Sequence, residues 1–154
     1  MKADIKLLKK LREKTGAGIA DCRKALEESA NDYKKAVEWI KKHGIEKAAK
    51  KSDRETSQGL VEAYIHNGGK VGAMVEITCE TDFVARTDDF KNLAHEVAMQ
   101  VAAMNPKDVP SLLQQEYIRD ASIKIEDLVK QAIAKLGENI VVRRLTRYEL
   151  DAND

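Results

Sequence analysis

Hydrophobic positions in the first 44 residues recur with a helical period in three short segments, at about 5–15, 19–29 and 32–43. Asp4 is expected to cap the first helix and Asn31 the third, with Gly44 ending the third. The glycines of Thr15-Gly16-Ala17-Gly18 interrupt the pattern between the first two helices. The pattern predicts a small three-helix domain with a shallow core.

The hydrophobic period changes from helical to two beyond Gly59. Residues 46–57 before it are charged, alanine-rich and short of large apolar groups, so a solvated connecting helix is expected there. Leu60, Ala63 and Ile65 indicate one strand and residues 71–78 a second. The turn signal Asn67-Gly68-Gly69-Lys70 between them predicts a β-hairpin.

The cleanest helical stripe follows, capped by Thr87 and ended by Asn105-Pro106. Its apolar positions are Phe90, Leu93, Ala94, Val97, Ala98, Val101 and Ala102. A second helix is expected over residues 122–136, ended by Gly137, and a final strand over residues 139–150. The order β-β-α-α-β predicts an α+β fold, with helices covering one face of a small antiparallel sheet. We therefore expect a helical domain with its connecting helix at 1–52 and a single core domain at 53–154.

Charge is unevenly divided, although the 27 basic and 26 acidic residues leave a net charge of only +1. Residues 1–55 have a net charge of +6 and the remainder a net charge of −5. The overall balance argues against a dedicated nucleic-acid or membrane-surface protein. Cys22 and Cys79 are expected to be reduced, small apolar side chains, and the protein is expected to be cytoplasmic, because the N-terminus lacks an apolar signal core.

Little in the sequence points to bond chemistry. His43, His66 and His95 lie on different elements without ligand partners at metal-binding spacing, so no metal site and no cofactor are expected. Cys79 with His66 is the only formal nucleophile and base pair, and a cysteine packed in the sheet is the favoured interpretation. The glycines at 16 and 18 lack the preceding strand and following Gly-Lys-Ser of a phosphate loop.

One connector, Cys79-Glu80-Thr81-Asp82-Phe83-Val84-Ala85-Arg86, joins the second strand to the best helix. The sheet and the helix are complete without it. Its aromatic and aliphatic side chains could plug the core, with Asp82 forming a turn. Alternatively, the segment presents an exposed hydrophobic group beside a carboxylate, which suits a binding tip. The residues alone leave both interpretations open.

Three separated motifs in this order resemble the elongation factor Ts family over nearly the whole chain. The first is Leu11-Arg12-Glu13-Lys14-Thr15-Gly16-Ala17-Gly18, continuing through Asp21-Cys22-Arg23-Lys24-Ala25-Leu26. The second is the 79–86 connector, and the third is Leu136-Gly137-Glu138-Asn139-Ile140, followed by Arg143-Arg144. The family comprises guanine nucleotide exchange factors for the translational GTPase elongation factor Tu, which are not enzymes with bond chemistry of their own.

The resemblance implies that the first 52 residues form a ubiquitin-associated-like domain that docks on the nucleotide domain of elongation factor Tu. It implies that Thr81, Asp82, Phe83 and Val84 insert near the magnesium and phosphate site of that partner. Further partner contacts implied by the resemblance are Leu11, Arg12, Ile19 and Arg23. The family position at Arg23 is often Lys, which keeps the charge but alters the donor geometry.

This chain is shorter than many relatives, and only about 20 residues separate Pro106 from the helix around Leu128. The resemblance therefore implies one core subdomain where longer members have two, and a homodimer that supplies the missing half. Sheet edges or the strand at 139–150 are the surfaces considered for the pairing. Two alternative functions remain. An RNA-binding module would use the basic first 55 residues and lose affinity steeply with salt. An enzyme using Cys79 and His66 would lose activity on Cys79→Ser. The exchange function is expected to involve no direct contact with nucleic acid or membrane.

Overall fold

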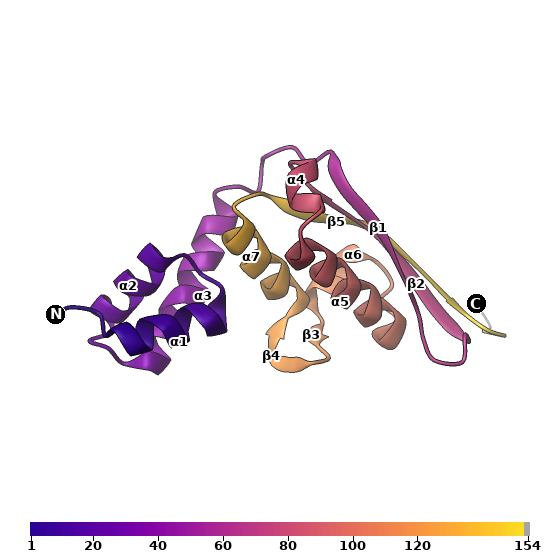
Figure 1. Cartoon of the computed structure of the whole chain (residues 1–154). Helices are drawn as coiled ribbons and strands as arrows, with labels where there is room; N and C mark the ends of the chain where they lie inside the picture. The colour runs from indigo at the N-terminus through magenta and orange to yellow at the C-terminus, as the bar shows by residue number, and fades with distance from the viewer. Residues whose placement is uncertain (153–154) are drawn as a thin grey trace.

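The computed structural model describes residues 1–152 and has two hydrophobic clusters arranged along an elongated molecule with its termini at opposite ends (Figure 1). Its helices are α1 (Ile5–Thr15), α2 (Ile19–Glu28), α3 (Tyr33–Ala49), α4 (Asp82–Ala85), α5 (Asp88–Met104), α6 (Val109–Gln114) and α7 (Ile125–Leu136). Its strands are β1 (Gln58–Ile65), β2 (Val71–Cys79), β3 (Glu116–Tyr117), β4 (Asp120–Lys124) and β5 (Ile140–Glu149). The predicted α+β fold is confirmed.

Helices α1, α2 and α3 enclose the first cluster, in which Leu11, Cys22 and Leu26 are fully buried. Asp4 caps α1 as predicted, and Gly16 ends it in the left-handed conformation that glycine adopts without steric cost. The cap predicted at Asn31 is wrong, because the Asp32 carboxylate accepts the Lys35 N–H at the start of α3. Asn31 instead lies in the turn, where its side chain accepts the Asp4 N–H and donates to the Lys2 carbonyl.

The predicted stop at Gly44 and the predicted solvated connecting helix are both wrong. Helix α3 continues through Gly44 to Ala49, and its last turns pack against α7. A Cβ added at Gly44 would lie 3.4 Å from the Ala134 Cβ, an ordinary contact distance, so Gly44 faces α7 from within α3 rather than ending the helix. Ala48 is buried in the second cluster. The small residues Gly44 and Ala48 therefore contact the core domain. The spacing of large hydrophobic residues in the sequence does not reveal such contacts, which is why solvent exposure was predicted. The boundary at residue 52 stays a prediction.

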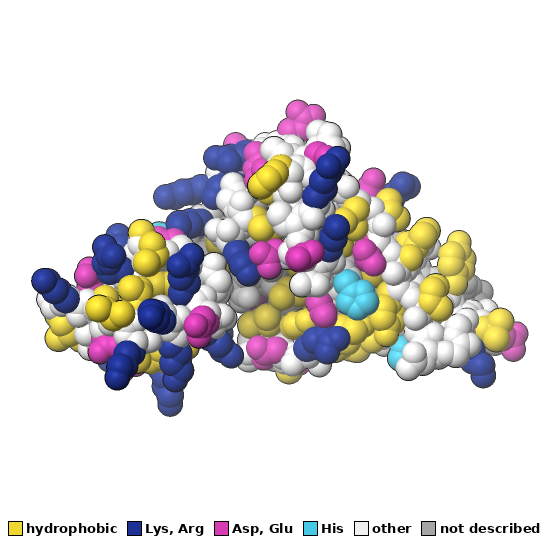
Figure 2. Space-filling model, in the orientation of Figure 1, with side chains coloured by type: hydrophobic (Ala, Val, Ile, Leu, Met, Phe, Trp, Pro, Cys, Tyr) yellow, Lys and Arg dark blue, Asp and Glu magenta, His cyan; other side chains and the backbone are white. Residues whose placement is uncertain are grey.

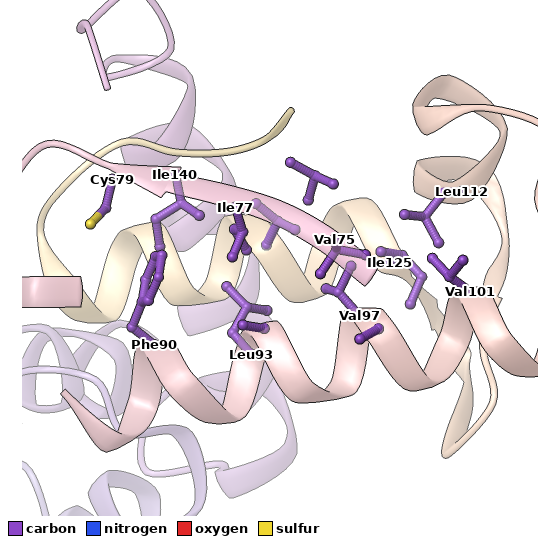
Figure 3. Packing of buried hydrophobic residues seen from close by; sticks show 14 of the residues in the cluster. Val75, Ile77, Cys79, Phe90, Leu93, Val97, Val101, Leu112, Ile125 and Ile140 are labelled. Atoms are coloured by element: carbon purple, nitrogen blue, oxygen red, sulfur yellow. The ribbon is translucent and has the colours of Figure 1, made fainter. Parts of the chain in front are cut away.

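The core contains a three-stranded antiparallel sheet in the order β1-β2-β5. Helices α5 and α7 lie on the same side of this sheet (Figure 1). The predicted hairpin is confirmed, with Gly68 and Gly69 both at positive φ in its turn. The predicted stripe of α5 packs directly onto β2, and Phe90, Leu93 and Val97 meet Val75 and Ile77 in a continuous apolar layer (Figure 3).

The segment between α5 and α7 is more structured than predicted. It forms the short helix α6 and the β3–β4 hairpin, and Ser122 belongs to β4 rather than to the following helix, which begins at Ile125. Buried Gln100 holds this hairpin to α5, because its amide donates to the Glu116 carbonyl and accepts the Ile118 N–H. Gln100, a polar residue on the buried face of α5, thus fixes the β3–β4 hairpin. The strands of this hairpin are too short and irregular to be predicted from the sequence pattern.

Candidate functional site

The connector between β2 and α5 forms a short helical turn, α4, at one end of the core domain (Figure 1). We call residues 81–84 the tip. Thr81 is the N-cap of α4, and its hydroxyl accepts the Val84 N–H at 3.3 Å. Thr87 then caps α5, as predicted, by accepting the Phe90 N–H. Two threonine caps six residues apart therefore begin two successive helices, which sets the direction of the tip relative to the sheet.

Both interpretations of the connector are realised, each by different side chains. Phe83 is 83% exposed, whereas its neighbour Val84 is only 5% exposed and Ala85 is buried beside it. On a helical turn, successive side chains point about 100° apart, so one can enter the core while the preceding one faces solvent. Val84 anchors the turn, and Phe83 projects from it as an exposed aromatic group.

Asp82 lies next to Phe83 on the exposed side of the tip. Its carboxylate forms an ion pair with Arg86, one helical turn later, at 2.8 Å. Both side chains are more than half exposed, so the pair contributes little to stability and leaves Asp82 accessible. The tip thus presents an aromatic ring beside a carboxylate.

Glu138 holds the base of the tip. The Thr81 N–H donates to Glu138 Oε1 at 2.9 Å, and the Thr81 hydroxyl donates to Oε2 at 2.7 Å. Glu138 follows Gly137, whose left-handed conformation ends α7 and turns the chain toward β5. The third sequence motif therefore contacts the second. Glu138 was not among the predicted site residues, although its place directly after the helix-ending glycine of a recognised motif was the available signal.

The predicted residues of the helical domain differ in exposure. Arg12, Ile19 and Arg23 are exposed on α1 and α2. Leu11 is fully buried in the first cluster, so the direct partner contact expected of it is not available in this structure. Its apolar side chain supports the helices that present the other three. A space-filling view in the same orientation as Figure 1 shows many Lys and Arg side chains over this domain (Figure 2).

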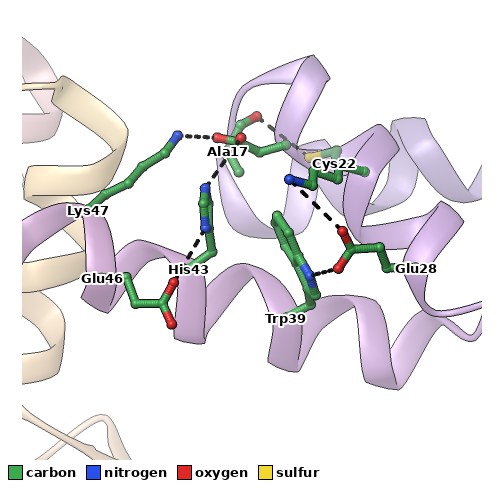
Figure 4. Close-up of polar contacts among 9 residues, drawn as sticks. Ala17, Cys22, Glu28, Trp39, His43, Glu46 and Lys47 are labelled. Atoms are coloured by element: carbon green, nitrogen blue, oxygen red, sulfur yellow. Dashed lines mark hydrogen bonds and ion pairs between the residues drawn. The ribbon is translucent and has the colours of Figure 1, made fainter.

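Polar contacts hold α2 against α3 and so fix the surface that bears Ile19 and Arg23. Asp21 on α2 pairs with Lys47 of α3, and the His43 imidazole lies between Asp21 and Glu46 (Figure 4). At the other end of α2, the Trp39 indole N–H donates to Glu28 at 2.6 Å (Figure 4). The two helices are therefore joined at both ends.

The nucleophile pair considered from the sequence is wrong. Cys79 is paired with Gln58, whereas His66 follows Ile65 at the opposite end of the β1–β2 hairpin. Eight residues of extended strand place them roughly 26 Å apart. Burial, with a further contribution from the negative charge of Glu138, raises the pKa of the Cys79 thiol to about 11. Cys79 is thus a buried, protonated thiol that donates to the Thr81 carbonyl at 3.2 Å.

The described part of the chain, residues 1–152, contains no group of three or more His, Cys, Asp or Glu side chains that could hold a metal ion. Across the same residues, no helix combines the length and apolarity needed to cross a membrane.

Two family models match the sequence. The model described as elongation factor TS matches residues 80–154, and the model described as elongation factor Ts, mitochondrial, N-terminal matches residues 1–49. The first match begins at Glu80 and so includes both the tip and Glu138.

Curated relatives cover nearly the whole chain. Elongation factor Ts of Herpetosiphon aurantiacus is 44% identical over 191 residues, covering 95% of this chain and 96% of the relative. That of Thermoanaerobacter sp. (strain X514) is 43% identical, covering 92% of each. That of Nostoc sp. is 51% identical over 145 residues, covering 94% of this chain but 46% of the relative. With these identities and a tip that lies within one of the two family matches, the chain belongs to the elongation factor Ts family.

Proposed function

We propose that this protein binds elongation factor Tu in its GDP-bound and nucleotide-free forms and promotes release of GDP. The tip would act near the magnesium and phosphate site of the partner. In GTPases, magnesium bridges phosphate oxygens and protein ligands and neutralises much of the phosphate charge. A factor that moves those ligands away weakens nucleotide binding without breaking any covalent bond of the nucleotide.

The exposure of Phe83 is the observation that carries the proposal. A large aromatic side chain that is 83% exposed contributes little to the fold, and exposed aromatic groups on a rigid support are typical anchors of protein interfaces. Phe83 would wedge between helices of the partner. Asp82 would add repulsion near the phosphates or compete for a cationic group of the partner.

The energetics follow from linkage between two binding sites. Whatever the factor does to the affinity of elongation factor Tu for nucleotide, nucleotide does to its affinity for the factor. A coupling free energy of ~4 kcal/mol corresponds to a roughly thousandfold weakening. GTP then rebinds and displaces the factor. Exposed Arg12, Ile19 and Arg23 would supply the docking contacts of the helical domain, separate from the tip.

We further propose that the protein acts as a homodimer that pairs the outer faces of two sheets. On this face, the register aligns Ile65, Gly72 and Tyr148 in one row and Ala63, Met74 and Thr146 in the next. Ile65, Met74 and Tyr148 are all exposed. These two rows form an apolar patch that is bordered by the Glu76–Arg144 ion pair of the next row. An exposed apolar patch of this kind is typical of a surface covered by another protein, and two copies related by a twofold axis would cover it mutually.

The exchange function is tested by measuring release of fluorescent GDP from elongation factor Tu with and without this protein. We expect a large acceleration that Phe83→Ala abolishes. Met104→Ala is the matched control, because it removes an exposed apolar side chain from the end of α5, outside the tip. Acceleration that survives Phe83→Ala would transfer the role to Asp82 or the helical domain. The absence of acceleration at any concentration would reject the exchange function and favour the RNA-binding alternative.

A further inference from the structure

The tip is connected to the segment that joins the two hydrophobic clusters. Strand β2 ends at Cys79 and pairs there with Ile140, the first residue of β5. Antiparallel pairing therefore places the residues just after β2 beside the residues just before β5. This juxtaposition brings Glu80 and Thr81 next to Glu138 and Asn139, which are separated from them by more than 50 residues of sequence.

Asn139 joins the tip to the segment that follows α3. Its backbone N–H donates to Glu80 Oε2 at 2.8 Å. Its side-chain amide donates to the Arg54 carbonyl at 2.8 Å and to the Ser52 carbonyl at 3.4 Å. Asn139 is only 3% exposed, so these hydrogen bonds are sheltered from competing water. The Arg54 guanidinium lies 3.6 Å from Glu80 and closes the network.

In this network, one side chain holds the tip and another holds the segment after α3. Glu138 holds Thr81, and therefore the first turn of α4, through a pair of charge-assisted hydrogen bonds. Asn139 holds the segment after α3, and Glu80 joins the two by accepting the Asn139 N–H.

We infer that Glu138 and Asn139 are positioning residues, which fix Phe83 in one orientation relative to the helical domain. The inference rests on the proposed exchange function. A factor that contacts its partner with two separate surfaces gains from a fixed distance and angle between them, because a flexible tip loses conformational entropy on binding. Glu138 sets the orientation of the tip, and Asn139 sets its relation to the segment that leads to α3.

The test compares Glu138→Ala with Glu138→Gln in GDP release from elongation factor Tu, measured over a range of factor concentrations. A glutamine can accept from the Thr81 N–H and donate to the Thr81 hydroxyl, so it can keep both contacts. We expect Glu138→Ala to lower the maximal release rate roughly ten- to hundredfold, the range for loss of a charge-assisted hydrogen bond, with a smaller change in the half-saturating concentration. Glu138→Gln should recover most of that rate.

Glu126→Ala is the matched control. It removes another hydrogen-bonded carboxylate, which pairs with Lys130 in the first turns of α7, without touching the tip. A general effect of losing one carboxylate from this part of the core would slow both variants equally. Circular dichroism verifies that each variant retains its helix content.

A double-mutant cycle separates positioning from general destabilisation. If Glu138 acts through Phe83, Glu138→Ala should slow release much less in a Phe83→Leu background, chosen because it keeps an apolar side chain at the tip, than in the native chain. Equal losses in both backgrounds would overturn the inference. The inference would also be overturned if elongation factor Tu released GDP at the native rate with Glu138→Ala.

Amide hydrogen exchange of the free chain provides a readout that does not depend on elongation factor Tu. We expect the Thr81 amide to exchange at least about tenfold faster in Glu138→Ala. Asn139→Ala keeps the backbone N–H that donates to Glu80 but loses the side-chain amide, so residues 52–54 should exchange faster. Unchanged protection of Thr81 in Glu138→Ala would overturn the positioning role. If the native chain did not accelerate GDP release while the tip lost protection as expected, the proposed function alone would fail.

Discussion

Phe83 and Val84 are consecutive residues of a four-residue helical turn, yet one is 83% exposed and the other 5%. Val84 belongs to the same buried cluster as Phe90 and Ile77, whereas Phe83 is outside that cluster. The turn is therefore attached to the core through one side chain and presents the next to solvent. Val84 therefore contributes to stability, whereas its neighbour Phe83 is free to bind a partner.

This division predicts that two adjacent substitutions change the free energy of unfolding by very different amounts. Val84→Ala removes buried methyl groups and should lower the free energy of unfolding by about 1–3 kcal/mol. Phe83→Ala removes an exposed ring and should change it by no more than about 0.5 kcal/mol. Urea denaturation followed by far-ultraviolet circular dichroism measures both. A loss of stability in Phe83→Ala as large as that in Val84→Ala would show that Phe83 packs against the fold.

Asp82→Asn separates the charge of the tip from its aromatic ring. Asparagine keeps the shape of the side chain but loses the negative charge, and the exposed ion pair with Arg86 contributes little to the fold. We expect stability near that of the native chain and a GDP release rate below the native rate but above that of Phe83→Ala. Arg86→Ala is the control, because it removes the ion pair while retaining the carboxylate. A native rate for Asp82→Asn would assign the exchange role to the ring alone.

The buried thiol of Cys79 predicts a loss of stability at alkaline pH. Its pKa is about 11 in the folded chain, against an ordinary value of 9.0, so the unfolded chain loses this proton at lower pH. The favourable contribution is complete below about pH 9 and decreases as the pH rises through 11. Urea denaturation at pH 8 and pH 10.5 should show a smaller decrease for Cys79→Ala than for the native chain. Parallel decreases in the two proteins would contradict this expectation.

The outer face of the sheet predicts a dimer that charge can disrupt. Ile65→Glu and Tyr148→Glu each place a carboxylate in the same row of the apolar face and should convert a homodimer into a monomer. Size-exclusion chromatography with light scattering at micromolar concentration measures the mass. Ile5→Glu is the matched control, because it charges an exposed apolar position on α1. A native chain that is strictly monomeric would refute the dimer.

The periodic pattern of the sequence was sufficient to predict the strongest local elements. Thr87, the stripe of α5 and Asn105 specify that helix through a cap, an apolar face and a left-handed end, all of which act within a few residues. The β1–β2 hairpin is likewise specified by a turn whose glycines adopt positive φ. Gly44 shows the limit of local rules, because its role depends on Ala134, a residue 90 positions away.

The sequence by itself determined the α+β class, most helix and strand positions, and the three motifs, including the residues of the tip. Local spacing could not decide whether Phe83 enters the core or faces solvent, because either orientation satisfies a short connector. The pairing of Cys79 with Ile140 and the packing of Val84 decided that question. They also brought Glu138 to Thr81 and Asn139 to Arg54. Contacts between residues so distant in sequence depend on the register of the sheet and the packing of the helices on it, which only the tertiary structure supplies.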